Sequence, residues 1–488
     1  MVNKVKRLGK ETLIYGTSTI LARMLNFFLV PFYTYYLITS DYGVIATVFA
    51  FMALFNIIYQ YGMDQAYLRF AQDTKTNDTF STPLLAVCGT SVILSLLIAL
   101  LSPVTAQFLG IGANNAYLIR YCVFILAFDA LNIVPFAKLR FEHRAWHFVI
   151  IRSVSIVVNV AGNICALKFF NWGIKGVFAA GILASLTSLI LLFPVVKESF
   201  VFRFDKNLFK QMFKFSWPFI PAGAASILVN VIDKPLLSHL TSLADVGVYQ
   251  ANFKIGIFMM LIVSMFDQAW RPFFIQEENA PDAKQTFAQI FTWSFALLGW
   301  VFLGLSLLMP LIIQTNIFGL NLINRAYWGG LKIIPFVVGG YFFYGCYINF
   351  MVAPVLTKKT TVLMKITLLG AVTSILVNIS VVPHIGILGA GWAILISYFV
   401  MALALFIFGQ KNYKIDYEYK KILLLTLIII AGYFVGTRFD GFSMKDNYIA
   451  KIILLCLYPL FVALVLRGSL KGQAFAQKAF KRLPFFKK

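Results

Sequence analysis

The sequence predicts an all-α polytopic membrane protein, and three observations support that prediction. First, 60% of the 488 residues are hydrophobic and only 12% are charged, which gives a mean hydropathy of +0.82. A soluble chain of this length could not bury so much apolar surface. Second, continuous apolar runs of about twenty residues, the length needed to cross the hydrocarbon, recur along the chain. Third, an internal duplication divides these runs into two similar sets.

Fourteen membrane-spanning helices are expected from these runs. Membrane strands would be shorter and would alternate apolar with polar residues, whereas the runs are long and continuous. The predicted spans lie near residues 12–38, 43–63, 83–105, 116–137, 148–168, 174–196, 215–240, 246–266, 287–314, 330–354, 361–382, 387–409, 422–437 and 448–466.

The distribution of basic residues predicts the orientation. With the N-terminus placed inside, 29 of the 42 Lys and Arg residues fall in the inner loops and tails. The positive-inside rule then places both termini in the cytoplasm. The same bias explains the net charge of +23 without a nucleic-acid partner, and no nucleic-acid-binding module is visible. The basic C-terminal tail is expected to contact membrane lipids.

The duplication is visible as polar landmarks that recur in the same order. The stretch "NFFLVPFYTYYLITSDYGV" at 26–44 aligns with "NVIDKPLLSHLTSLADVGV" at 230–248, and "DQAYLRF" at 64–70 returns as "DQAWRPF" at 267–273. A later segment beginning at Asn163 resembles one beginning at Asn378. Chance similarity between apolar helices would not preserve Asp, Gln, Pro and Gly in sequence.

The duplication predicts the domain organisation. Residues 1–204 and 205–410 each form a lobe of six helices, and residues 411–488 add two helices and the basic tail. Six helices per copy is an even number, so both copies enter the membrane in the same orientation. We therefore expect a pseudo-two-fold relation between the lobes and a site at their interface.

Two further stretches carry a resemblance to a known family. The opening "KETLIYGTSTILARMLNFFLVPFYTYYL", the following "SDYGVIATVFAFMALFNIIYQYGMDQAYLRF" and the duplicated halves resemble the multidrug, oligosaccharidyl-lipid and polysaccharide exporter superfamily, in particular its polysaccharide-unit (O-antigen type) flippases. The resemblance implies a V-shaped bundle that alternates between inward-open and outward-open states. It also implies transport of an undecaprenyl-pyrophosphate-linked saccharide across the inner membrane, as in lipopolysaccharide assembly.

Charged residues inside the predicted spans indicate where a substrate site lies. Five such residues are singled out, namely Arg23, Asp129, Asp233, Lys234 and Lys254. Each such charge costs about 3 kcal/mol at the bilayer centre, and such residues usually face a bundle interior or water. We therefore expect them to line a wet, partly charge-paired cavity.

Three of these residues are cationic, which suits a pyrophosphate headgroup. Polar side chains three or four residues away share a helical face with them. The expected substrate-binding residues are Arg23, Asn26, Asn230, Lys234, Gln250 and Lys254. In the alternative reading, Arg23 pairs with Asp233 as a structural bridge and Lys254 extends towards the interface.

Four carboxylates are candidates for ion coupling or gating, namely Asp64, Asp129, Asp233 and Asp267. Asp129 is a candidate for coupling to H+ or Na+. The alternative is a hydrogen bond to Arg120 or to a Ser or Asn on a neighbouring helix. Asp64 and Asp267 lie at cytoplasmic helix ends with Arg69 and Arg271 close by, so gate contacts, helix caps and local salt bridges are all open.

Other recurring polar residues are expected to be structural. Asp41 and Asp245 follow short outer loops and precede Gly, so helix N-capping is expected. The polar stripes Ser155–Asn159–Asn163 and Ser374–Asn378 suit hydrogen bonds between helices.

The chain is not expected to be an enzyme and needs no cofactor or metal. It has no Walker-type phosphate loop, no G-x-S-x-G and no paired-cysteine zinc motif. The absence of these motifs favours transport, and the resemblance implies that the substrate is a lipid-linked oligosaccharide, moved by a monomer with a cationic central cavity. A cation-coupled multidrug exporter of the same superfamily is the first alternative, and a membrane-embedded glycan polymerase or acyltransferase is the second.

Overall fold

The computed structural model describes residues 24–466 except 26, 74–76 and 318, and nearly all of them are helical. Within this part of the chain, twelve helices are long and apolar enough to span a membrane, or thirteen when one bent pair counts as a single span. The predicted all-α polytopic fold is confirmed. Each predicted span from 43–63 onwards overlaps one of these helices. The first, at 12–38, lies largely outside the described residues, so the total of fourteen stays a prediction.

The described chain forms two compact units. The first comprises residues up to Ala251 together with Asn378–Ala390. Its elements are α2 (Thr39–Gln60), α3 (Met63–Asp73), α4 (Asn77–Leu100), α5 (Ser102–Phe108), η1 (Ala113–Asn115), α6 (Ala116–Phe141), α7 (Ala145–Ile164), the π-helical η2 (Cys165–Phe169), α8 (Gly173–Ser199), α9 (Lys206–Ser216), α10 (Phe219–Val231), α11 (Asp233–Leu240) and most of α12 (Leu243–Phe253). Helix α6 is the centre of this unit because α2, α3, α4 and α8 all pack against it.

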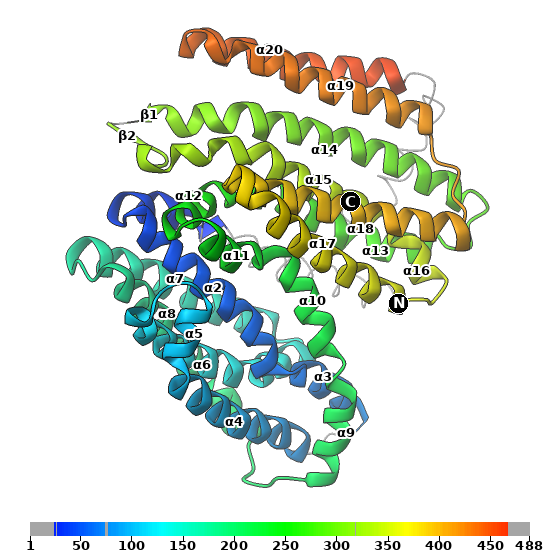
Figure 1. The fold of residues 1–488 in the computed structure, drawn as a ribbon. Helices are drawn as coiled ribbons and strands as arrows, with labels where there is room; N and C mark the ends of the chain where they lie inside the picture. Colours follow the sequence, from blue (N-terminus) through cyan, green and yellow to red (C-terminus); the bar gives the residue numbers. More distant parts are fainter. Residues whose placement is uncertain (1–23, 26, 74–76, 318, 467–488) are drawn as a thin grey trace. The chain divides into compact units, whose positions relative to one another are not determined.

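The second unit comprises Asn252–Val377 and the described residues from Gly391 onwards. Its elements are α13 (Gly256–Gln276), α14 (Ala283–Gln314), β1 (Asn316–Ile317), β2 (Leu320–Asn321), η3 (Arg325–Ile333), α15 (Ile334–Phe350), α16 (Val352–Leu356), most of α17 (Thr361–Ile385) and α18 (Ile387–Asn412), α19 (Tyr419–Arg438), η4 (Phe439–Gly441) and α20 (Met444–Leu466). Helix α14 packs against α15, α19 and α20, and Figure 1 shows α19 and α20 beside it.

The compact units divide the chain at Ala251, whereas the duplication divides it near residue 204. The physical reason is that α10 and α11, which follow the repeat boundary, pack against α2 of the first unit. The lobes 1–204, 205–410 and 411–488 are defined by repetition in the sequence, and they stay a prediction.

Two glycines at equivalent positions of the duplication bring α2 and α12 together. A Cβ added at Gly43 would lie 1.8 Å from the carbonyl oxygen of Leu243, and one added at Gly247 would lie 1.9 Å from the carbonyl oxygen of Thr39. Thr39 and Leu243 are themselves equivalent in the duplication, so the contact has local two-fold symmetry. No residue larger than Gly fits this backbone approach.

Candidate functional site

The predicted substrate residue Lys234 lies in the first turn of α11 and is only 5% exposed. Its Nζ is 2.7 Å from Oδ1 of Asp233 and donates to the carbonyl oxygen of Asn230 at 3.0 Å. The Tyr249 hydroxyl donates to the other carboxylate oxygen of Asp233 at 2.5 Å. A buried charge requires such compensation. The neighbouring carboxylate therefore balances the charge that Lys234 could offer to an anionic substrate in this conformation.

Gln250 and Lys254 lie on either side of the end of α12. Gln250 is buried, and its Oε1 is one of the buried side-chain atoms without a hydrogen-bond partner in the described structure. Lys254 lies at the 46° bend between α12 and α13. Broken helices at membrane depth are tolerated where they are buried in protein or line a water-filled cavity. The bend therefore favours a polar environment for Lys254.

Of the three remaining residues of the expected substrate site, the structure describes Asn230. The side-chain amide of Asn230 donates to the carbonyl oxygen of Ser226 at 3.3 Å. Arg23 and Asn26 lie outside the described residues, and so does the alternative pairing of Arg23 with Asp233. The cationic substrate site therefore stays a prediction.

A polar cavity of about 280 Å³ lies inside the first unit, around Asp129. Two carboxylates, from Asp64 and Asp129, and two guanidinium groups, from Arg140 and Arg152, line it. Amide and hydroxyl groups complete the polar lining, from Asn56, Gln60, Asn132, Ser155 and Ser188. The cavity thus brings together two of the predicted coupling and gating residues, and its formal charges balance.

Asp129 accepts a hydrogen bond from a serine on a neighbouring helix. The Ser185 hydroxyl of α8 donates to its Oδ1 at 2.7 Å, which is one of the two alternatives predicted for this residue. The other is wrong as regards Arg120, whose Nε donates to the Ser102 hydroxyl at 3.1 Å instead. Asn132, one turn along α6, donates to the carbonyl oxygen of Ser185 at 3.2 Å. Its own Oδ1 has no partner within the described structure, so the cavity keeps an unused acceptor.

Asp64 forms an ion pair with α6. Nη2 of Arg140 lies 3.1 Å from its Oδ2. The expected proximity to Arg69 does not lead to pairing, because Arg69 binds Asp73, its i+4 neighbour, at 3.0 Å.

In the second copy of the motif, the arginine follows the aspartate by four positions, whereas in the first copy it follows by five. Arg271 is the i+4 neighbour of Asp267, and its Nε lies 2.6 Å from Oδ1 of that residue. Asp267 therefore forms the local salt bridge that was one of the predicted alternatives. Asp64 therefore forms an ion pair between two helices, whereas its equivalent Asp267 forms one within a single helix.

Sequence reasoning did not single out the two arginines of the cavity. The guanidinium carbon of Arg152 lies 4.5 Å from the centroid of the Phe136 ring, a cation–π contact. Arg152 falls inside the predicted span 148–168, so its intramembrane charge was a usable signal. Arg140 falls in a basic inner loop, where the charge bias alone explained it.

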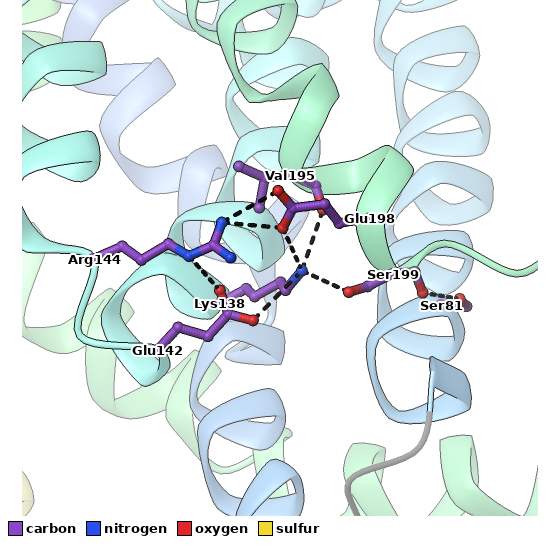
Figure 2. A network of polar contacts seen from close by, with 7 residues as sticks. All are labelled: Ser81, Lys138, Glu142, Arg144, Val195, Glu198 and Ser199. Atoms are coloured by element: carbon purple, nitrogen blue, oxygen red, sulfur yellow. Dashed lines mark hydrogen bonds and ion pairs between the residues drawn. The ribbon is translucent and has the colours of Figure 1, made fainter.

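A network of polar contacts joins the end of α6 to the end of α8 (Figure 2). Lys138 is 4% exposed, and its Nζ lies 2.5 Å from the Ser199 hydroxyl and 3.5 Å from carboxylate oxygens of both Glu142 and Glu198. Arg144 lies 3.0 Å from both of those glutamates. Two cations and two carboxylates thus tie α6 and the start of α7 to α8, which fixes the helices that carry Asp129 and Ser185.

Among the residues predicted to be structural, the stripe Ser155–Asn159–Asn163 is confirmed and Asp41 is corrected. Ser155 donates to the carbonyl oxygen of Ala184 at 2.9 Å, and Tyr33 donates to Oδ1 of Asn163 at 2.9 Å, so this stripe does form hydrogen bonds between helices. The prediction that Asp41 caps α2 is wrong. The N-cap of α2 is Ile38, and Asp41 lies in the first turn of the helix.

Comparison with known proteins decides the family. Residues 8–278, more than half of the chain, match the family model described as "Polysaccharide biosynthesis protein". The chain belongs to this family. This match confirms that the resemblance stated from the sequence leads to a polysaccharide-related family.

Individual relatives are distant but extend over most of the chain. Protein 1 of the Lsg locus of Haemophilus influenzae is 20% identical over 409 residues, covering 80% of this chain and 97% of the relative. The structure of the lipid II flippase MurJ in an inward closed conformation has a TM-score of 0.76 at 16% identity, covering 94% of this chain and 100% of that one. An inward-facing multidrug resistance MATE transporter of the MOP superfamily has a TM-score of 0.61 at 13% identity, covering 83% and 96%. These two likenesses show a shared fold.

Proposed function

We propose that this protein is a flippase that moves polyprenyl-pyrophosphate-linked oligosaccharide units across the bacterial inner membrane for surface polysaccharide assembly. The match to the polysaccharide biosynthesis family over residues 8–278 is the observation that carries the proposal. The fold shared with a lipid II flippase over 94% of the chain supports it. In this proposal the protein moves its substrate without changing it, with both termini in the cytoplasm.

Cations in the membrane region bind the substrate headgroup in this proposal. Arg23 and Lys254 bind the pyrophosphate, and Lys234 joins them when its ion pair with Asp233 opens. Asn26, Asn230 and Gln250 bind phosphate or sugar hydroxyls. The unused Oε1 of buried Gln250 and the position of Lys254 at a helix bend support this assignment.

Alternating access requires one end of the protein to close tightly and then open. The contact of Gly43 with Leu243 and of Gly247 with Thr39 supplies a tight closure between two equivalent helix starts. In the predicted orientation this contact lies at the outer side. It is therefore the outer gate in the proposed cycle, and the described conformation has that gate closed.

Asp129 is the proposed coupling residue. Its carboxylate lies in a polar cavity with an unused acceptor on Asn132, so the cavity offers room and hydrogen bonds for water. Two guanidinium groups in the same cavity disfavour a metal cation. Coupling to H+ is therefore proposed in preference to Na+.

Deletion of the gene tests the proposed function. We expect cells without the protein to lose surface polysaccharide and to accumulate lipid-linked saccharide on the cytoplasmic side, with unchanged resistance to cationic drugs. Increased drug sensitivity with normal polysaccharide would instead establish the multidrug exporter.

Complementation then tests the cationic site. The double variant Arg23→Ala, Lys254→Ala should fail to restore surface polysaccharide at a normal protein level. The matched control is Lys210→Ala, which removes an exposed lysine of α9 and should complement fully. Full complementation by the double variant would remove the proposed headgroup site.

A further inference from the structure

A second cavity lies at the end of the first unit that faces outward in the predicted orientation. Its volume is about 620 Å³, which is within the usual range of small-molecule sites. The first turn of α2, the start of α6, the start of α8 and the loop before α8 line it. The polar and aromatic residues among its lining are Asp41, Tyr117, Tyr121, Asn171, Trp172 and Lys175.

This cavity combines aromatic rings with groups of opposite charge. The rings of Tyr117 and Tyr121 lie 6.4 Å apart, edge to face, and Nζ of Lys175 lies 5.1 Å from the Tyr117 ring centroid. Trp172 is 55% exposed, and Phe170 stacks on its ring at 5.2 Å. Aromatic residues that only anchor a protein at the membrane interface need no charged groups lining the same cavity. The carboxylate of Asp41 and the ammonium of Lys175, which both line this cavity, therefore point to a polar ligand.

The duplication provides an internal comparison for Asp41. Its equivalent, Asp245, accepts a hydrogen bond from the Ser242 hydroxyl at 2.8 Å, and that hydroxyl accepts one from the Asp245 backbone N–H at 3.1 Å. This pair caps the start of α12. In the first copy Ile38 replaces Ser242, so no such hydroxyl is present. The Asp41 carboxylate lines the cavity instead.

The loop that carries Trp172 is also particular to the first copy. Gly173 follows Asn163 by ten positions, whereas Gly386 follows Asn378 by only eight. The longer connection contains the π-helical turn η2 and Asn171, whose φ is +50°. Both π-helical turns and left-handed residues other than Gly occur preferentially at functional sites. The extension places the Trp172 ring at the cavity.

We infer that this cavity binds the saccharide of the lipid-linked substrate on the outer side of the membrane. A sugar ring has C–H groups that pack on aromatic rings and hydroxyls that bond to carboxylate, amide and ammonium groups. Tyr117, Tyr121 and Trp172 supply the rings, and Asp41 and Lys175 supply the polar partners. The formal charges of the cavity balance, which suits the saccharide and not the pyrophosphate. This inference rests on the proposed function.

A binding experiment with the native saccharide tests the inference. The probe is the oligosaccharide released by mild acid from the carrier lipid that accumulates in cells lacking the protein. Its affinity for the full-length protein in lipid nanodiscs is measured by saturation-transfer NMR titration. We expect the wild type to bind, and Trp172→Ala to weaken binding about tenfold, which is about 1.4 kcal/mol. Asp41→Asn should also weaken it.

The matched control is Trp146→Ala. Trp146 is 59% exposed and lies at the start of α7, at the opposite end of the helix from the Trp172 loop. This variant should bind like the wild type, and equal thermal unfolding of all variants shows that they fold. Equal binding by Trp172→Ala and Trp146→Ala, or no binding by the wild type, would overturn the inference while leaving the flippase proposal standing. Cells that accumulate no lipid-linked saccharide would overturn both.

Discussion

At the scale of single residues, charge compensation decides which predicted site residues are available to a substrate. Lys234 and Asp233 were both identified from the sequence as intramembrane charges, yet they bind each other. Asp64 was identified as a gate residue, and its partner is Arg140 on α6. The spacing of residues along the sequence cannot reveal a pair such as Asp64 and Arg140, whose members lie on different helices. It can reveal pairing within a helix, as for Asp267 and Arg271.

The Asp233–Lys234 pair leads to a stability prediction. Asp233→Asn leaves the Lys234 ammonium buried without its counter-charge, so the free energy of unfolding should fall by about 3–5 kcal/mol. Adding Lys234→Met removes the unpaired charge and should recover most of that loss. Thermal unfolding of the purified variants in detergent measures both effects. A double variant no more stable than Asp233→Asn would show that the pair does not stabilise the protein in this way.

Asp129 leads to a prediction about coupling. In proteoliposomes, Asp129→Asn should reduce transport under a pH gradient to the rate measured without one, because the amide cannot take up and release a proton. Ser185→Ala keeps the carboxylate and serves as the control, so its transport should still respond to the gradient. An undiminished gradient response in Asp129→Asn would assign coupling to another residue.

At the scale of elements, the sequence predicts the helices well because each span must be about twenty apolar residues long. It predicts their partners poorly. No periodic pattern in the sequence indicates that α10 and α11 pack against α2. The same is true of the short hairpin of β1 and β2. The duplication nevertheless predicts which helix starts are equivalent, and the contact between Gly43 and Gly247 joins two such starts.

The glycine contact leads to a prediction about the outer gate. Gly43→Ala should force α2 and α12 apart, because its Cβ would overlap the Leu243 carbonyl oxygen, and the population with an open outer end should rise severalfold. A cysteine at Ser40 then reacts faster with a membrane-impermeant maleimide added outside. Gly89→Ala is the control, since a Cβ there meets nothing within 4 Å.

The labelling needs a background without reactive thiols, so the exposed cysteines Cys88, Cys165 and Cys456 are replaced first. Unchanged labelling in a folded Gly43→Ala variant would show that this contact does not control access from outside.

At the scale of the whole molecule, composition and repetition predict a helical polytopic membrane protein, and the long apolar helices of the described chain confirm this class. Composition and repetition do not predict the polar cavity around Asp129, which depends on five helices that converge in three dimensions. Nor do they predict the outer aromatic cavity, although the two-residue extension before Gly173 was visible in the alignment of the two copies. An insertion in one copy of a duplicated fold is thus a useful pointer to a site that the other copy lacks.

The central claim is that the protein itself moves a lipid-linked saccharide across a bilayer. The direct measurement uses proteoliposomes loaded with the carrier-linked saccharide from cells lacking the protein, and it follows how fast the glycan becomes accessible to a lectin outside. We expect this rate to exceed that of empty liposomes in the wild type and to fall to the empty-liposome rate in the Arg23→Ala, Lys254→Ala variant. A folded wild-type protein that leaves the glycan as inaccessible as in empty liposomes would contradict the claim.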